Sequence, residues 1–397
     1  MKKVLISGAG VAGLTLAYWL KKFGFVPTIV EKHPSLRTGG YKVDLRGVAL
    51  EILKRMDLHP AIVEARTKIK YAVCVDSKGN QVSEMTPDLL GTRLEGVDLE
   101  IMRGTLCVLM KEAVGDSEYI FGDTITSIAD KSDGIFVEFE NHPARTFDLV
   151  IGADGLHSTV RKLVFGDEGQ FSQEFGVYIS VFSFQNFINL SDCEIEQHSL
   201  RKFVNLYGDC NDVNAKAALA FSLPQPFSFR DPQEQQNCIL EAFKDATWEL
   251  PRILAEMKNS SDFFFDSMAQ IHMPRWSQGR VALVGDAAYS ASPMSGQGTS
   301  MAIAGAYMLA GELAETRDYL EAFTRYETEL RPFVKKNQDL ALMSARIMSG
   351  SLYSIVLHRL VALLPRRIIR YFQEKALVET TAAANALTLK DYHGKNR

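Results

Sequence analysis

The sequence has few cysteines and no pattern that would pair them. Only five occur among 397 residues, and no two of them form a C-x-x-C pair. A secreted disulfide framework and a zinc site built on closely spaced cysteines are therefore not expected. We expect reduced thiols in a cytoplasmic protein and no bound metal. The cysteines are Cys74, Cys107, Cys193, Cys210 and Cys238.

Long hydrophobic runs are also lacking. The most apolar late segment, 351–364, is interrupted by His358 and Arg359 and is too short to span a bilayer. The first strand candidate starts almost at Met1, so we expect no secretory leader. The formal net charge is only −4. Nothing in the charge balance therefore favours nucleic acid or an anionic membrane as a partner.

Glycine is placed at the start of the chain in a pattern typical of nucleotide binding. An apolar strand over 3–7 runs into the sequence G-A-G-V-A-G at 8–13, and a helix follows over 14–23. A second strand over 28–30 ends at Glu31. The glycines allow a tight turn, the approach of a pyrophosphate to the helix N-terminus, and close helix–strand packing.

Glu31 narrows the choice of nucleotide. It follows the first glycine at the roughly 20-residue interval expected of the acid that binds a ribose 2′-hydroxyl. An acid at this place favours an unphosphorylated ribose, and therefore FAD or NAD over NADP.

A second glycine-rich motif lies far along the chain. The apolar run 281–284 is typical of a buried parallel strand, and Gly285 ends it. Asp286 then lies at the carboxyl end of that strand, where open α/β sheets bind ligands. A helix over 299–314 would direct its N-terminus at a ring that gains negative charge on reduction. Pro293, Gly296 and Gly298 shape the loop between them.

The order of these patterns predicts an α/β fold with an insertion. We expect a Rossmann-like FAD-binding domain with an inserted β-rich substrate domain and C-terminal helices. Strand candidates at 176–184, 203–207 and 217–223 and a helix at 232–243 mark the insertion. The expected divisions are 1–170 and 271–340 for the FAD-binding domain, 171–270 for the substrate-binding domain, and 341–397 for a helical tail.

Three motifs in order carry a family resemblance. They are the glycines of 8–13, the run G-A-D-G-L-H-S-T-V-R at 152–161, and Gly285-Asp286 with its loop to Gly298. Together they resemble the single-component (group A) flavin monooxygenases related to para-hydroxybenzoate hydroxylase. Within that family the chain is most similar to the tetracycline-inactivating monooxygenases, the tetracycline destructases. The closer similarity lies at 18–25, 40–47 and 99–104.

The resemblance implies roles for particular residues. The N-terminal glycines would approach the FAD pyrophosphate, Asp286 would bind the ribityl chain, and Asp154 belongs to a motif that serves both FAD and NADPH. Arg37 would contact the nicotinamide donor. The residues expected to contact FAD are Gly8, Gly10, Ala12, Gly13, Glu31, Lys32, Asp44, Arg46, Arg103, Asp154, Gly285, Asp286, Pro293, Gly296, Gly298 and Thr299.

The resemblance also implies the chemistry. NADPH or NADH reduces the flavin, dioxygen adds at the flavin C4a, and the terminal oxygen attacks an electron-rich phenol or enol carbon. We therefore expect no catalytic protein nucleophile, because the flavin carries the chemistry. The expected partners are O2 and a tetracycline-like or phenolic substrate, and the expected protein is a monomer.

Some positions depart from the family pattern, and they leave alternatives open. Tyr289 stands where members often have histidine, and Ser300 and Gly305 stand where many have asparagine and aspartate. The leading hypothesis is hydroxylation and inactivation of a tetracycline-like antibiotic. One alternative is an aromatic or polyketide hydroxylase of the same family. Another, of a different class, is an FAD-binding dehydrogenase or other non-oxygenating flavoprotein.

Two groups of residues outside these motifs also allow two interpretations. The aromatic residues of the insertion fit a strand face, where core packing is favoured over substrate lining. The tail 344–387 could lie on a membrane as an amphipathic helix, but we favour packing across the substrate opening. The aromatic residues are Tyr178, Phe182, Phe184 and Phe221.

His157 and His272 are expected to be structural, since nothing beside them completes an acid–base pair.

Overall fold

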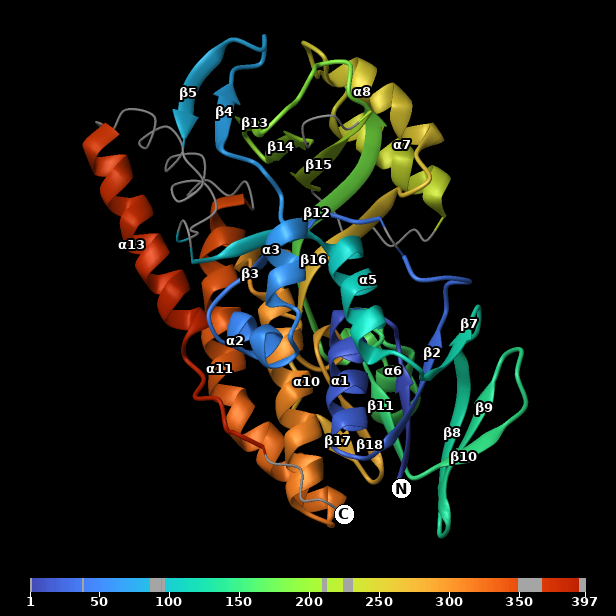
Figure 1. Ribbon diagram of the computed structural model, residues 1–397. Coiled ribbons are helices and arrows are strands. Elements are labelled where there is room, and N and C mark those ends of the chain that lie inside the picture. The colour runs from blue at the N-terminus through green and yellow to red at the C-terminus, as the bar shows by residue number, and fades with distance from the viewer. Residues whose placement is uncertain are drawn as a thin grey trace.

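The computed structural model describes residues 2–37, 39–85, 94, 97–208, 213–223, 231–348 and 366–392. Figure 1 shows a lower part built on a parallel sheet, with a second sheet above it. Two expectations, those for Cys210 and for the apolar segment 351–364, lie outside the described residues. No helix within the described ranges is long and apolar enough to cross a membrane.

The lower part is the predicted nucleotide-binding sheet. Its strand order is β17-β18-β11-β1-β2-β7, and every pair is parallel except β17 with β18. Ser7 pairs with Gly152, which in turn pairs with Leu283. The loops after β1, β11 and β18 therefore leave the same edge of the sheet. The strands are β1 (Lys3–Ser7), β2 (Val26–Glu31), β7 (Glu118–Phe121), β11 (Leu149–Gly152), β17 (Ser277–Gln278) and β18 (Val281–Leu283).

Two helices pack against each other beside this sheet. They are α1 (Val11–Lys22) and α10 (Gly298–Glu315), and both are almost entirely buried. Close packing depends on small residues. A Cβ on Gly13 would lie 1.9 Å from the Gly8 carbonyl oxygen, and one on Gly285 would lie 2.9 Å from the Cβ of Ala12. These distances explain why glycine occupies both positions, since a larger residue would push the elements apart.

The second sheet has the strand order β16-β12-β15-β14-β13-β4-β5. One face packs against α7 (Pro232–Ala242) and α8 (Leu250–Glu256) and forms its own core cluster. The four aromatic residues of the insertion belong to that cluster, so the core-packing interpretation is confirmed. The strands are β4 (Tyr71–Val75), β5 (Gln81–Met85), β12 (Ser172–Gln185), β13 (Cys193–Ser199), β14 (Lys202–Tyr207), β15 (Asn214–Ser222) and β16 (Phe264–Ile271).

This sheet does not follow the expected division at residue 170. The hairpin of β4 and β5 lies at 71–85, yet β4 pairs with β13 in parallel and extends the second sheet. The remaining strands are β3 (Lys42–Leu45), β6 (Leu99–Met102), β8 (Ile125–Lys131), β9 (Gly134–Phe139) and β10 (Arg145–Phe147). The shorter helices are α2 (Val48–Arg55), α3 (His59–Ala65), α5 (Arg103–Val114), α6 (Thr159–Phe165), α9 (Asp286–Tyr289), η1 (Glu168–Gln170), η2 (Met257–Asn259) and η3 (Pro293–Ser295).

The C-terminal part is helical, as expected. The long helix α11 (Tyr319–Met348) packs against α10, and α13 (Arg366–Ala384) lies beside α11 (Figure 1). The chain then returns to α10. There the Tyr392 hydroxyl and the Lys390 ammonium both donate to the Glu312 carboxylate, at 2.7 and 2.8 Å.

Candidate functional site

A cavity of about 450 Å³ lies between the carboxyl edge of the parallel sheet and the second sheet. That volume is within the range of small-molecule sites, roughly 300–1,000 Å³. All three sequence motifs reach it, through Gly10 and Ala12, through Gly155, and through Asp286 and Gly298. Segments separated by hundreds of residues thus meet at one place, because their strands end at the same edge.

The N-terminal loop is held against the middle motif. Gly8 has a φ of +105°, and a Cβ there would lie 2.5 Å from the Ala153 carbonyl oxygen. Gly10 is the N-cap of α1, and a Cβ on it would lie 3.3 Å from a guanidinium nitrogen of Arg103. The start of α1 therefore presents backbone N–H groups next to a buried cation, which suits an anionic pyrophosphate.

Glu31 lies at the end of β2 and supports the same loop. Its carboxylate accepts hydrogen bonds from the backbone N–H of Ala9 at 2.8 Å and of His33 at 3.0 Å. These contacts fix the orientation of the carboxylate that the sequence assigns to a ribose. Lys32 follows with an exposed side chain. Ribose binding by these two residues stays a prediction.

Asp286 and Arg103 form the charged centre of the cavity. The Asp286 side chain is accessible from the cavity, yet protein surrounds it. Burial raises the pKa of Asp286 to about 6, while the positive charge of Arg103 opposes that rise. Burial lowers the pKa of Arg103, but the neighbouring Cys107, Tyr41, Asp286 and Glu31 outweigh burial and raise it. Arg103 is therefore a permanent cation beside the predicted pyrophosphate site.

Arg37 lies at the rim of this charged region. Its side chain is exposed, but partial desolvation and the positive charge of Arg103 lower its pKa, while Glu31 opposes that effect. Two arginines this close favour an anion between or beside them. The geometry is compatible with a phosphate-bearing nicotinamide donor, and contact with that donor stays a prediction.

Asp44 and Arg46 lie side by side on and after β3, as the sequence suggested. Asp44 lines the main cavity, and its Oδ2 accepts a hydrogen bond from Arg46 Nη2 at 2.6 Å. Arg46 is only 2% exposed and lines a separate cavity of about 210 Å³, together with Gly47 and Ala384. Arg46 thus orients the Asp44 carboxylate through this hydrogen bond and also faces the end of α13.

Asp154 supports the middle motif from within. Its carboxylate accepts hydrogen bonds from the Ser158 hydroxyl at 2.5 Å and the Val160 backbone N–H at 3.1 Å. Burial raises the pKa of Asp154. This carboxylate therefore shapes the turn before α6, while its neighbour Gly155 lines the cavity. His157 in the same turn bridges Glu168 and Asp266 at 2.9 Å each.

The loop before α10 fits a flat polar group. Pro293, Gly296 and Thr299 line the cavity, and a Cβ on Gly296 would have nothing within 4 Å. Gly298 and Asp286 also line the cavity, at the start of α10 and of α9. An open face beside a helix N-terminus fits a flat ring that carries negative charge. The residues present are therefore compatible with FAD.

The opposite wall of the cavity was not identified from the sequence. Phe203, Asn205 and Tyr207 line it from β14. Lys42 also lines it, with its ammonium 5.0 Å from the centre of the Tyr207 ring, and forms ion pairs with Glu194 and, at 3.4 Å, with Glu100. The alternation of residues 203–207 was a usable signal for this wall, because every second side chain of a strand shares a face.

Comparison with known proteins agrees with this geometry. The family described as "FAD binding domain" matches residues 1–341. A flavin-dependent monooxygenase of Legionella longbeachae is 40% identical over 338 residues, which cover 85% of this chain and 87% of that protein. An uncharacterized protein of Mycobacterium tuberculosis strain H37Rv is 44% identical over 357 residues, covering 88% of this chain and 95% of that protein.

The fold comparison adds a solved structure. The crystal structure of tetracycline destructase Tet(51) superposes on this chain with a TM-score of 0.88. The two are 35% identical, and the match covers 99% of this chain and 100% of that one. The likeness therefore extends over both sheets and the C-terminal helices.

Proposed function

The chain belongs to the FAD-binding family of flavin-dependent monooxygenases, and from that premise we propose that it hydroxylates and inactivates tetracycline-like antibiotics. It would use NADPH or NADH as the electron donor and O2 as the oxygen source. The observation that carries the substrate proposal is the likeness to a tetracycline destructase over 99% of the chain. The substrate would lie between the flavin side of the cavity and the wall formed by β14.

The residues of the first half of the site would bind and orient the cofactor. Bound FAD supplies the redox chemistry that activates dioxygen. The start of α1 and Arg103 would hold the pyrophosphate, Glu31 the ribose, and Asp286 the ribityl hydroxyls. The N-terminus of α10 would stabilise negative charge on the ring, an effect of about 0.3–1 kcal/mol when exposed and up to about 2 kcal/mol when partly buried.

The second half of the site would select and shield the substrate. Phe203 and Tyr207 offer aromatic surface to a planar substrate, and Asn205 offers a polar group between them. A bound substrate packed against these rings would exclude water, which strengthens the electrostatic contacts around it. The protein would therefore supply orientation and exclusion of water, while no side chain acts as a nucleophile.

The proposal is tested by turnover of tetracycline with the purified flavoprotein. We expect NADPH or NADH oxidation to accelerate when tetracycline is added, and mass spectrometry to find a product heavier by one oxygen atom. The product should no longer inhibit bacterial growth. Donor oxidation that no tetracycline accelerates, with no oxygenated product, contradicts the substrate proposal.

Two other outcomes of the same assay would support the alternative functions. Oxygenation of a phenol or another polyketide, but not of tetracycline, identifies a hydroxylase of the same family with a different substrate. Flavin reduction without oxygen uptake in the presence of every candidate indicates a non-oxygenating flavoprotein. The matched control is the Asp286→Ala variant, in which weaker FAD binding should reduce donor oxidation, oxygen uptake and product formation together.

A further inference from the structure

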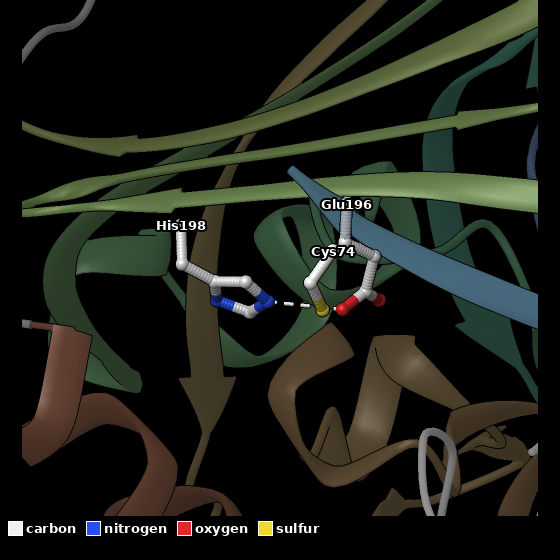
Figure 2. A group of neighbouring side chains, drawn as sticks. All are labelled: Cys74, Glu196 and His198. Atoms are coloured by element: carbon white, nitrogen blue, oxygen red, sulfur yellow. Dashed lines mark hydrogen bonds and ion pairs between the residues drawn. The ribbon is translucent and has the colours of Figure 1, made fainter. Parts of the chain in front are cut away.

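Three potential metal ligands converge on one face of the second sheet. Cys74 of β4 is the register partner of Glu196 on the neighbouring strand β13. His198 lies two residues after Glu196, so it projects from the same face. The sulfur, nitrogen and oxygen donor atoms all lie within 4.8 Å of one another, and Figure 2 shows the three side chains pointing toward a common centre.

We propose that Cys74, Glu196 and His198 form a zinc-binding site. Thiolate, imidazole and carboxylate are the three ligand types that Zn²⁺ uses in proteins. With bonds of about 2.3 Å to sulfur and about 2.0 Å to nitrogen, tetrahedral geometry places neighbouring donors roughly 3.5 Å apart. His198 Nε2 and Glu196 Oε2 are 2.9 Å apart. Small side-chain rotations within the present spacing would therefore complete the site, with a fourth position left open.

The surroundings provide both orientation and access. Asn205 donates a hydrogen bond from its amide nitrogen to Glu196 Oε1 at 3.2 Å, so Oε2 is the oxygen directed at the group. Hydrogen bonds of this kind hold metal-binding carboxylates in place. The Glu196 side chain is only 10% exposed, whereas that of His198 is 49% exposed. The ion can therefore enter from the side of the imidazole.

The charges also balance. A thiolate and a carboxylate together neutralise the two positive charges of zinc, which suits a partly buried position. Zinc competes with protons for its ligand atoms, so its affinity should decrease as the pH decreases.

The zinc site would stiffen one wall of the cavity described above. Asn205 contacts Glu196, and the Phe203 ring lies 4.8 Å from the His198 ring, centre to centre. Both Asn205 and Phe203 line the cavity. The ion would join β4 to β13 and so restrict the strand pairing that positions these two residues. In this proposal the ion links the two strands and takes no part in the redox chemistry.

The test measures metal binding to the FAD-loaded enzyme. Competition with a chromogenic chelator should show one Zn²⁺ per chain, with weaker binding at lower pH. Cobalt added in place of zinc should give, in the difference spectrum, a thiolate-to-cobalt charge-transfer band and ligand-field bands at long wavelengths, where oxidised flavin does not absorb. The ligand-field bands report tetrahedral coordination.

Variants assign the site. Cys74→Ser and His198→Ala should each weaken zinc binding by more than about tenfold, because loss of an outer hydrogen bond alone costs that much. Cys238→Ser is the matched control, since Cys238 is also a partly exposed free thiol but lies on α7. Flavin content and circular dichroism confirm that each variant is folded. The proposal is overturned if the wild type binds no stoichiometric zinc, or if Cys74→Ser and Cys238→Ser bind it equally well.

Discussion

At the carboxyl end of the parallel sheet, Asp286 is an acidic group that lines the cavity together with Arg103. With a pKa of about 6, its carboxyl is mostly ionised at neutral pH. A hydrogen bond to a charged group contributes about 1.5–3 kcal/mol. Asp286→Ala should therefore weaken FAD binding by roughly ten- to a hundredfold. The measurement is the ratio of flavin to protein absorbance after gel filtration.

The Asp286→Asn variant serves as the conservative comparison. Its amide keeps a hydrogen-bonding group at the same place, so it should retain more FAD than the alanine variant. An Asp286→Ala protein that stays fully yellow and active would contradict the assigned role.

His157 gives a prediction for pH dependence. Its hydrogen bonds to Asp266 and Glu168 raise its pKa to about 10, and burial only partly opposes this effect. Because the folded state holds the proton more tightly, the stabilisation is fully present below the unfolded pKa of about 6.5 and is lost as the pH rises through about 10. The side chain is 58% exposed, so solvent screening keeps the contribution to about 1 kcal/mol or less.

The comparison is between wild type and His157→Gln. The wild type should unfold at a higher temperature at pH 6, and this advantage should decrease as the pH rises and disappear above pH 10. Added salt should reduce it at pH 6. A difference between the two proteins that does not change with pH would show that the imidazolium charge is not the cause.

At the scale of elements, local patterns predicted most of the parallel sheet. β1 was predicted over its whole length, and α10 starts within a residue of its expected position. These elements are encoded by glycines, apolar runs and helix periodicity that lie next to one another in the chain. The place of the β4–β5 hairpin was missed, because pairing of β4 with β13 joins residues more than a hundred positions apart.

The site was also predictable only where its residues follow a local pattern. The glycine loops and Asp286 could be recognised because each lies at the end of its own strand. The wall formed by β14 could not be recognised, because it lines the cavity only when the second sheet packs opposite the parallel sheet. The expectation of no zinc site rested on cysteine spacing along the chain. Spacing of that kind says nothing about Cys74 and Glu196, which become neighbours only through strand pairing.

Tyr289 and Gly305, which both depart from the family pattern, contact each other where α9 packs against α10. A Cβ on Gly305 would lie 1.8 Å from the Tyr289 hydroxyl and 3.1 Å from a methyl carbon of Leu330. Replacing glycine by alanine within a helix normally stabilises by about 0.5–1 kcal/mol. Here we expect Gly305→Ala to destabilise the protein, by about 1–3 kcal/mol, because the core is overpacked. Thermal unfolding measures the change.

A double variant tests the cause of that effect. Tyr289→Phe alone should cost about 0.5–1.5 kcal/mol, since the Tyr326 hydroxyl lies 3.2 Å from the hydroxyl that is removed. Added to Gly305→Ala, however, it removes the closest clash. The two changes together should therefore cost less than the sum of the single changes. Strict additivity would mean that the tyrosine is not what excludes the alanine.

At the scale of the whole molecule, the last described residues pack against the C-terminal part of α10. Glu312 of α10 is 1% exposed, and its charge is met by Lys390 and Tyr392 from the end of the chain. Gly311 allows the Tyr392 ring to pack directly against α10, because a Cβ at that position would lie 2.1 Å from the ring. The end of α13 packs on the turn at Gly47, where a Cβ would lie 2.5 Å from the Ala384 carbonyl oxygen. The tail thus connects α10 to the turn behind Asp44.

Removing one hydroxyl should loosen this connection. Tyr392→Phe leaves the buried Glu312 carboxylate with one donor fewer, at a cost of about 1–3 kcal/mol. Because the cost falls on the docked state of the tail, trypsin should cleave after Lys390 faster than in the wild type, before the flavin-binding core unfolds. Tyr371→Phe is the control, since Tyr371 is 63% exposed on α13. Equal cleavage rates in all three proteins would show that the Tyr392–Glu312 hydrogen bond does not hold the tail in place.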